Sequence, residues 1–554
     1  MNTDNDVIVI GGGPGGASCA AALARGGRRV LLLEKASFPR DHVGESLSPS
    51  VLDATRVLGA GEQLVTAGFA PKAGATFAWG DDPQPWTVAY PAANGPAAYQ
   101  VRRAEFDTIL LQAAICSGAD VRLGWRVEDV EHSSGRPVAV LAAAPDGGVQ
   151  RLAAPWVVDA SGAPGLLAQR LGRNIGPAEL DRIALWGYWR DSQPGEARSR
   201  HSLLVGRRDA CLWHYPLDDR SELASIGVIV RGDGARQLLG GPPDGFYRAA
   251  VGACPELAPL VSSAVLEGEV RVADASAYAS RQLAGRGWFL VGDAAFFVDP
   301  LLTPGIQLAM QSGTLAAQCL QTILDRPAAQ AAALDLYDRV LRRDYDTFTW
   351  LSRNLYRAAD TARLPEAGER GQAPEVDGQF AFLSLIAGLP KTELARLFGG
   401  YMGVRGKAAA RSGKPVVPGE KEGFAFLTWV FRSGKLAEAR ADLSTPELDE
   451  DCVLLPAPNA AIAEELFVPS PAAQVLTSRT AARNRQGDRF EATPELVALF
   501  QVLGDGCPYE KAMEQFCEIA ECHDEDCRPR FDNWIKLLAD HGLIEWRPGG
   551  QGVT

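Results

Sequence analysis

The first forty residues place two short hydrophobic runs on either side of a glycine-rich turn. Asp6-Val-Ile-Val-Ile10 is a continuous apolar run, which is typical of a strand buried on both faces. Gly11-Gly-Gly-Pro-Gly-Gly16 follows, then an alanine-rich segment that predicts a helix over residues 17–26. Arg29-Val-Leu-Leu-Leu-Glu34 is the next buried run. Together these segments predict a βαβ unit of about 30 residues.

The α/β pattern continues further along the chain. Apolar runs at residues 156–160 and 288–292 predict two more buried strands. Between them, residues from about 175 to 285 hold short alternating segments such as Ser225-Ile-Gly-Val-Ile-Val230, which predict a separate β-sheet layer for a substrate. Apolar positions at helical spacing then predict long helices over residues 306–326 and 331–360.

The remaining sequence predicts two further parts after a catalytic domain at residues 1–360. Residues 361–465 are interpreted as a linker and helical extension, which contains a basic loop at 403–415. Thr493-Pro-Glu-Leu has the cap and first-turn proline of a helix start. Residues 466–554 are therefore expected to form a small helical domain, with a winged helix as one form it could take.

Composition narrows the classes of function. The 554 residues are 46% hydrophobic and 22% charged, with a net charge of −13, which argues against a nucleic-acid partner. The hydrophobic runs are too short for a membrane span, and the polar start of the chain is unlike a signal peptide. We therefore expect a cytoplasmic protein with free thiols.

A cluster of cysteines and one histidine near the C-terminus is a candidate metal site. Structural zinc sites usually contain a closely spaced Cys-x2-Cys pair, which this cluster lacks. Core thiols with one exposed Cys-His pair explain the pattern better, so no metal is predicted. The cluster consists of Cys507, Cys517, Cys522, His523 and Cys527.

The glycine-rich turn has the context that dinucleotide binding requires. Gly11, Gly13 and Gly16 stand between a strand and a helix, and Glu34 ends the next strand. Glycines let the backbone approach a pyrophosphate at the helix N-terminus, and a carboxylate at the strand end bonds ribose hydroxyls. The other residues expected at this site are Pro14, Gly15 and Lys35.

Two further segments favour FAD over NAD. Val101-Arg-Arg-Ala-Glu-Phe-Asp107 resembles a helix start of flavin hydroxylases in which Arg103 would meet the FAD pyrophosphate. Val291-Gly-Asp-Ala-Ala295 resembles their second fingerprint, in which Asp293 would bond the ribityl chain. The resemblance implies the α/β fold of group A flavin monooxygenases. That fold is FAD-binding and Rossmann-like (GR2 or p-hydroxybenzoate-hydroxylase-like), with a β-sheet substrate layer and, here, a helical C-terminal region.

A narrower resemblance begins at Phe38-Pro-Arg-Asp-His-Val-Gly-Glu-Ser46. This segment is similar to one in flavin-dependent halogenases, and Lys72 stands where those enzymes carry their catalytic lysine. Cys211-Leu-Trp-His-Tyr-Pro216 resembles their W-x-W-x-I-P strand but keeps only Trp213 and Pro216 of its motif residues. The likeness is greatest to the branch that acts on phenolic or pyrrolic substrates, often bound to a carrier protein.

The resemblance implies a mechanism and its residues. FADH2 from a separate flavin reductase, O2 and chloride would give hypochlorous acid, which Lys72 relays to an electron-rich ring. Trp213 would separate the flavin from the substrate, and Glu45 would lie near the lysine. Residues implied at the cofactor are Arg40, Ser46, Pro300, Gly305 and Ile306, and those implied at the halide are Thr303, Pro304 and Gly305.

Proline at the halide turn leaves alternatives open. Pro304 has no amide N–H to offer a halide, and Thr-Pro-Gly turns also occur in ordinary flavin hydroxylases. A flavin hydroxylase or dehydrogenase on the same fold is therefore the second interpretation. In a third, the C-terminal domain mainly recruits a partner. Without the family context, Lys72 reads as a surface lysine and Trp213 as a core residue.

Overall fold

The structure is a computed structural model that divides the chain into two compact units. The first consists of Met1–Gly434 with Ser470–Gln474, and the second of Lys435–Pro469 with Val475–Thr554. The structure describes residues 5–361 except 80–84, 90–95, 97, 134, 164, 193–199, 208–209, 219–221, 233–234 and 240–241. It also describes residues 453–456, 461–467, 477–483, 489–491, 507–519, 531, 535 and 544–547.

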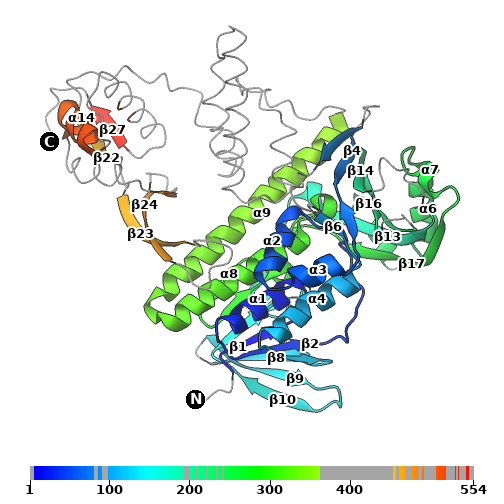
Figure 1. Cartoon of the computed structure of the whole chain (residues 1–554), viewed down its shortest axis with the longest axis horizontal. Coiled ribbons are helices and arrows are strands. Elements are labelled where there is room, and N and C mark those ends of the chain that lie inside the picture. The colour runs from blue at the N-terminus through cyan, green and yellow to red at the C-terminus, as the bar shows by residue number, and fades with distance from the viewer. Residues whose placement is uncertain are drawn as a thin grey trace, which may run out of the picture. The chain divides into compact units, whose positions relative to one another are not determined.

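A six-stranded sheet forms the centre of the first unit (Figure 1). Its order is β19-β20-β11-β1-β2-β7, and all neighbours pair in parallel except β19 and β20. The buried strands expected from the four apolar runs are confirmed. The strands are β1 (Val7–Ile10), β2 (Val30–Glu34), β7 (Asp120–Leu123), β11 (Trp156–Asp159), β19 (Ala284–Gly285) and β20 (Trp288–Leu290).

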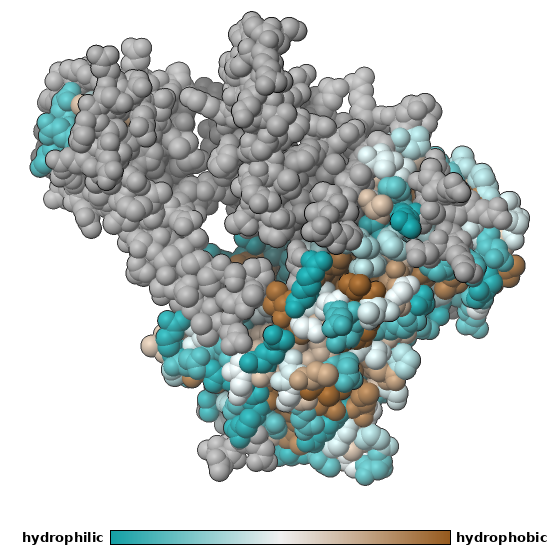
Figure 2. Space-filling view, in the orientation of Figure 1, coloured by the Kyte–Doolittle hydropathy of each residue, from teal (hydrophilic) through white to brown (hydrophobic). Residues whose placement is uncertain are grey.

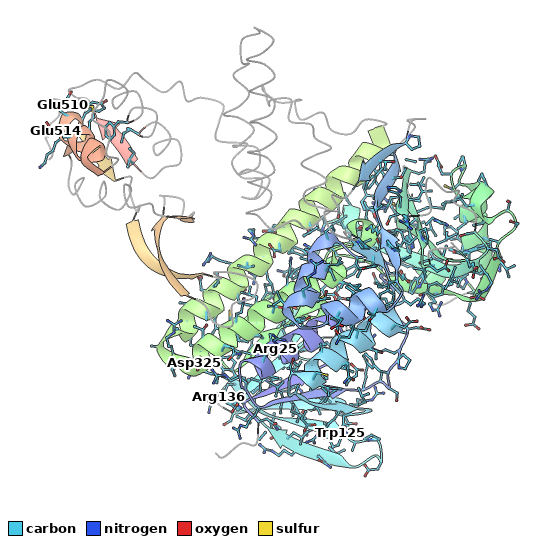
Figure 3. All side chains as sticks on the ribbon, viewed as in Figure 1. Arg25, Trp125, Arg136, Asp325, Glu510 and Glu514 are labelled. Carbon is cyan, nitrogen blue, oxygen red and sulfur yellow. The ribbon has the colours of Figure 1, made fainter. Side chains whose placement is uncertain are left out.

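Glycine lets two helices of this unit pack closely. Helices α1 (Pro14–Arg25) and α8 (Gly305–Asp325) lie against each other. A Cβ at Gly313 would come within 2.2 Å of the Gly15 carbonyl oxygen, so only glycine fits at this crossing. Asp325, labelled in Figure 3 at the end of α8, accepts a hydrogen bond of 2.5 Å from Arg28. The predicted second long helix is α9 (Gln330–Thr361).

A seven-stranded sheet forms the predicted substrate layer. Its order is β17-β13-β16-β15-β14-β4-β5, so β4 and β5, which precede residue 175 in the sequence, also belong to it. Helices α6 (Asp244–Ala253) and α7 (Ala258–Val261) cover one face through a core that includes Ile226, Val228 and Tyr247. Its strands are β4 (Gly74–Trp79), β5 (Trp86–Ala89), β13 (Arg182–Arg190), β14 (His201–Arg207), β15 (Ala210–Pro216), β16 (Leu223–Arg231) and β17 (Val265–Asp274).

Smaller elements complete the first unit. A two-stranded sheet pairs β3 with β6, and two three-stranded sheets have the orders β10-β9-β8 and β12-β18-β21. The strands are β3 (Ala70–Lys72), β6 (Ala98–Gln100), β8 (Arg126–Ser133), β9 (Arg136–Ala143), β10 (Val149–Ala153), β12 (Arg173–Ile175), β18 (Tyr278–Ser280) and β21 (Phe296–Phe297). The helices are α2 (Pro49–Val57), α3 (Gly61–Thr66), α4 (Arg103–Cys116) and α5 (Ala168–Leu171), with short 3-10 helices η1 (Ala178–Leu180), η3 (Arg236–Leu239), η4 (Gly292–Ala294), η5 (Pro300–Leu302) and η6 (Pro327–Ala329).

The described part of the second unit contains strands as well as a helix. Its two sheets have the orders β26-β22-β27 and β23-β24-β25. The helix expected from residue 493, the basic loop at 403–415, and Cys522, His523 and Cys527 lie outside the described residues. The elements are β22 (Val453–Pro456), β23 (Ala461–Phe467), β24 (Thr477–Arg483), β25 (Arg489–Glu491), β26 (Cys507–Pro508), α14 (Tyr509–Ile519) and β27 (Ile544–Arg547).

On the face shown in Figure 2, hydrophobic residues are interspersed with hydrophilic ones. Among the described helices, none combines the length and apolar character needed to cross a bilayer.

The close approach of Trp213 to Gly227 gives a stability prediction. A Cβ at Gly227 would lie 2.1 Å from the Trp213 ring, so Gly227→Ala overpacks the sheet and should destabilise it by about 1–3 kcal/mol. The matched control is Gly252→Ala in α6, where a Cβ meets nothing within 4 Å and should stabilise the helix. Thermal unfolding should show a lower Tm for the first variant only. Equal Tm values for the two variants contradict this packing.

Candidate active site

The glycine-rich turn has a shape that suits a dinucleotide. Gly11 has a φ of +103°, and a Cβ at Gly16 would lie 2.0 Å from the Gly11 carbonyl oxygen. The Gly12 amide donates a hydrogen bond of 2.7 Å to Glu34 Oε2, which holds the carboxylate of β2 beside the turn. Helix α1 begins at Pro14, so its first amide groups point at this turn. The turn therefore fits a pyrophosphate with a ribose near Glu34.

Two arginines share one buried carboxylate beside this turn. Arg103 donates to Asp107 through Nε (2.8 Å) and Nη2 (3.1 Å), and Arg40 Nη2 lies 3.3 Å from the same side chain. Asp107 is fully buried, and a Cβ on Gly13 would lie 3.3 Å from Arg40 Nη2. This arrangement can hold phosphate groups.

The second motif, residues 291–295, lies next to the glycine-rich turn and beside α8. Asp293 lies in η4, directly after β20. A Cβ at Gly15, on the first turn of α1, would lie 2.7 Å from Val291, one residue before η4. Burial raises the pKa of Asp293 to about 6, and the charges of Arg103 and Arg173 oppose that rise. Asp293 therefore lies close enough to the pyrophosphate site to contact the same extended cofactor.

The turn at residues 299–305 is held by a buried carboxylate. Asp299 accepts from the Leu301 amide (2.8 Å) and lies 3.2 Å from the Tyr356 hydroxyl of α9. Thr303 follows with a φ of +54°, a left-handed conformation that is strained for threonine. Pro304 then precedes Gly305 and Ile306 at the start of α8, whose first amides have no partner within the helix. The turn therefore offers the amide N–H groups at the start of α8 as donors, but none from Pro304, which has no N–H.

Lys72 is a buried lysine at the end of β3. Its side chain is 3% exposed, and Nζ donates to Ser46 Oγ (2.7 Å) and to the Leu47 carbonyl oxygen (3.1 Å). Burial lowers the pKa of its amine to about 7. Ser46 is in turn 3.2 Å from Ser202 Oγ, which accepts a 2.7 Å hydrogen bond from Gln100. Two neutral acceptors, the Ser46 hydroxyl and the Leu47 carbonyl, therefore help to hold the amine in place.

Glu45 lies next to Ser46 in the chain but bonds a different partner. Its Oε1 accepts a hydrogen bond of 2.9 Å from the Tyr188 hydroxyl on β13. Burial raises the pKa of Glu45, and the hydrogen bond from Tyr188 opposes that rise. Residues 45–47 thus connect Lys72 to the face of the seven-stranded sheet that lies opposite α6.

Trp213 lies on that same face. Ser225 of β16 pairs in register with Tyr215 and Tyr188, and Gly227 pairs with Trp213. The Trp213 ring covers Gly227, its Nε1 donates to Ser225 Oγ (3.2 Å), and it stacks on Tyr215. Trp213 therefore lies in the cross-strand row next to that of Tyr188, whose hydroxyl contacts Glu45.

The structure brings the predicted residues into two neighbouring groups. Arg40, Arg103 and Glu34 lie around the glycine-rich turn, and Ser46, which is also expected at the cofactor, accepts a hydrogen bond from Lys72. Lys35 is exposed at the surface. Some partners carry no signal in the sequence, because only the fold brings segments that are far apart in the chain together. These are Gln100, Tyr188, Ser202 and Tyr356.

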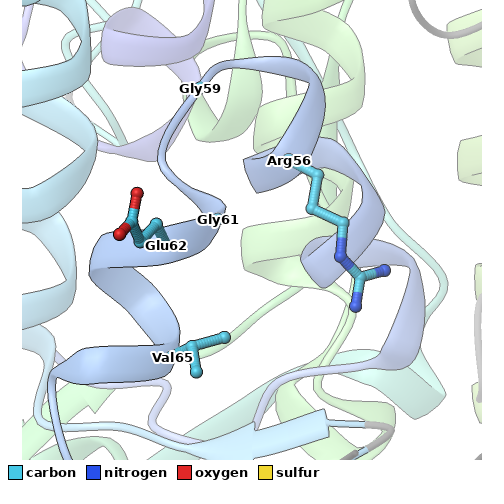
Figure 4. Close-up of a pocket in the computed structure, with 5 residues that line it drawn as sticks. All are labelled: Arg56, Gly59, Gly61, Glu62 and Val65. Atoms are coloured by element: carbon cyan, nitrogen blue, oxygen red, sulfur yellow. The ribbon is translucent and has the colours of Figure 1, made fainter. Parts of the chain in front are cut away.

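A surface recess lies away from both groups. Figure 4 shows it between α2 and α3, lined by Arg56, Gly59, Gly61, Glu62 and Val65. None of these five residues is among the predicted site residues. In the part of the chain that the structure describes, no three His, Cys, Asp or Glu side chains lie together as a metal site would require.

Comparison with known proteins supports this geometry. The family model described as an FAD binding domain matches residues 4–344. A tryptophan 2-halogenase of Chondromyces crocatus is 34% identical over 338 residues, which are 60% of this chain and 64% of that protein. The flavin-dependent halogenase armH3 of Armillaria mellea is 32% identical over 389 residues, covering 66% of this chain and 77% of that protein. The match to the first relative thus spans slightly less than two thirds of its length.

Solved structures give the same result. The myxobacterial chondrochloren halogenase CndH, described as a variant of FAD-dependent halogenases, aligns with a TM-score of 0.61 at 32% identity, over 69% of this chain and 90% of that one. The flavin-dependent halogenase CmlS aligns over 100% of this chain and 98% of that one, with a TM-score of 0.69 at 24% identity, which shows the shared fold.

The chain is therefore an FAD-binding protein. Within that class it belongs to the flavin-dependent halogenases, a family of enzymes. The predicted α/β fold and the predicted family are both confirmed.

The shared carboxylate of Asp107 gives a prediction for FAD affinity. The planar guanidinium of Arg103 pairs with Asp107 through two nitrogens. Arg103→Lys leaves only a single ammonium group there, so FAD binding should weaken at least about tenfold. Arg102→Lys is the matched control, because Arg102 pairs with the exposed Glu105 one turn away. Flavin fluorescence titration measures both dissociation constants. Equal affinity in the two variants contradicts a role of Arg103 at the cofactor.

Proposed function

We propose that this chain is an FADH2-dependent halogenase that relays hypohalous acid through Lys72 to an electron-rich aromatic substrate. The observation that carries the proposal is the buried amine of Lys72, whose pKa falls to about 7. When bound, the reduced flavin supplies the two electrons with which O2, chloride and a proton yield hypochlorous acid, oxidised flavin and water. The chain's own residues then direct that oxidant.

The Lys72 amine has the properties of a nucleophile. At and above pH 7 a large fraction of it is neutral, because burial disfavours the ammonium form. Its nitrogen can displace hydroxide from chlorine, giving a chloramine and water. The ring then takes the chlorine, and its displaced proton returns to the nitrogen. Hydrogen bonding of intact HOCl by the same amine is the related route.

The surrounding groups keep the amine in position and dry. Ser46 and the Leu47 carbonyl accept from Nζ, and Trp213 covers part of the neighbouring sheet. The Tyr188–Glu45 hydrogen bond connects the sheet to residues 45–47. A water-poor site slows loss of a diffusible oxidant to solvent. We assign Glu45 a positioning role, through Tyr188.

The halide is proposed to bind at the Thr303-Pro304-Gly305 turn. The first amides of α8 supply donors and the positive end of the helix, with Pro300 and Ile306 on either side. Asp299 and Tyr356 hold the turn from behind. Chloride is the proposed ion.

Partners follow from the same chemistry. FADH2 is proposed to come from a separate flavin reductase, and the substrate to be a small aromatic molecule or one tethered to a carrier protein. The cysteines at positions 19, 116, 211, 254 and 319 are free thiols, which suits the reducing cytoplasm that we propose as the location.

A flavin hydroxylase or dehydrogenase is the second candidate. Pro304 favours it, because it removes an amide from the turn that would hold the halide. The test is mass spectrometry of products formed with FADH2, O2, chloride and a panel of free and carrier-bound phenols and pyrroles. The proposal expects a mass shift with the isotope pattern of chlorine. Oxygen insertion without halogen under the same conditions favours the second candidate.

Lys72→Met should separate halogenation from flavin oxidation. It removes the amine while keeping an unbranched side chain, so halogenated product should fall at least about a hundredfold while FADH2 is still oxidised. Lys511→Met, at an exposed position in α14, should leave the product yield unchanged. Substantial chlorination by Lys72→Met rules out the assigned relay.

The depressed pKa of Lys72 also predicts a pH profile. Since the reactive form is the neutral amine, kcat/KM for halogenation should rise with pH through a midpoint near 7 and then level off. The rate of FADH2 oxidation, measured in parallel, should not show this midpoint. A rise centred near 10.5 would indicate a solvated amine.

A further inference from the structure

The site wall contains a buried hydrogen-bond donor that the proposed mechanism does not use. Trp186 on β13 is 7% exposed, and within the described part of the chain its indole Nε1 has no hydrogen-bond partner. A buried polar group without a partner is costly, and such groups are rare in folded proteins. The indole N–H is a donor only, so it needs an acceptor.

Neighbouring tryptophans show that the sheet can satisfy such a group. Trp189 Nε1 donates to the Tyr247 hydroxyl (2.7 Å), and Trp213 Nε1 donates to Ser225 Oγ (3.2 Å). Trp189 points to the core beneath α6, where Tyr247 lies. The unsatisfied donor at Trp186 is therefore a local feature of the opposite face.

Strand register places Trp186 in the candidate site. Side chains alternate along a strand, so Trp186 shares a face with Tyr188, whose hydroxyl contacts Glu45. Gly227 pairs with Trp186 on one side and Trp213 on the other. Trp186 and Trp213 thus lie in one cross-strand row, next to the row that reaches residues 45–47. Gly227 has no side chain between the two tryptophans, and the Trp213 ring lies over it.

We propose that the Trp186 N–H donates a hydrogen bond to an oxygen on the substrate ring, and so determines specificity for phenolic substrates. The inference rests on the proposed halogenase function. A wall made of tryptophan rings suits the face or edge of a flat arene. A site that hydrogen-bonds a substrate oxygen discriminates against the analogue that lacks it, because the buried donor is then left without a partner.

The test compares two electron-rich rings in the holoenzyme. 4-Methylphenol carries an oxygen acceptor, whereas indole carries only an N–H donor. Trp186→Phe removes the donor and keeps an aromatic wall, so the dissociation constant and KM for 4-methylphenol should rise about tenfold or more, with indole changed less than about twofold. The rate of FADH2 oxidation should stay the same, which shows that the flavin site is intact.

Trp189→Phe is the matched control. It removes an indole N–H from the opposite face, so it should lower Tm without changing the preference between the two rings. The distribution of halogen between ring positions gives an independent measurement, since loss of an orienting hydrogen bond should broaden it in Trp186→Phe alone.

Each contrary result has a distinct meaning. An equal loss for both rings in Trp186→Phe makes Trp186 a packing residue and overturns the proposal. Unchanged values for both rings mean that water satisfies the N–H, which also overturns it. Wild-type enzyme that halogenates indole but neither binds nor halogenates 4-methylphenol contradicts this inference and leaves the halogenase function standing. Binding of 4-methylphenol that depends on Trp186, without any halogenation, supports the donor and contradicts the proposed function.

Discussion

Desolvation of a single amine is the constraint on which the site depends. A lysine placed 3% exposed among apolar strands cannot keep its proton as a solvated lysine does, and its pKa falls to about 7. The fold supplies hydroxyl and carbonyl acceptors to this amine through Ser46 and Leu47. A carboxylate in their place would have favoured the charged form and raised the pKa again. Glu45 instead bonds Tyr188.

At the proposed cofactor site, by contrast, burial is combined with paired charges. There the buried carboxylate of Asp107 orients Arg40 and Arg103 beside the glycine-rich turn. Phosphate groups need fixed cations, whereas a halogen relay needs a neutral amine. Residues 38–47 pass from Arg40, near the turn, to Ser46, at Lys72, and so connect the two environments within a few residues.

Local sequence predicted the fold, and motifs made Lys72, Arg103 and Asp293 candidates for the site. The βαβ unit and the long helices could be predicted because each depends on a short-range pattern. Trp186, Tyr188 and Ser202 could not, since their importance comes from the register of strands that are far apart in the sequence. For the same reason, the sequence does not indicate that β4 and β5 belong to the substrate sheet. A motif places Ser46 near a site but does not predict that its hydroxyl accepts a hydrogen bond from Lys72.

The most direct test of the account is the ionisation of the Lys72 amine itself. Lysines of the holoenzyme can be reductively methylated with 13C-formaldehyde and titrated by 13C NMR, with the Lys72 signal identified by its absence from Lys72→Met. We expect a midpoint near pH 7 for this signal, well below the usual value for a lysine amine. A midpoint near 10.5 would mean that the amine is solvated and protonated, and would contradict its role as the halogen carrier.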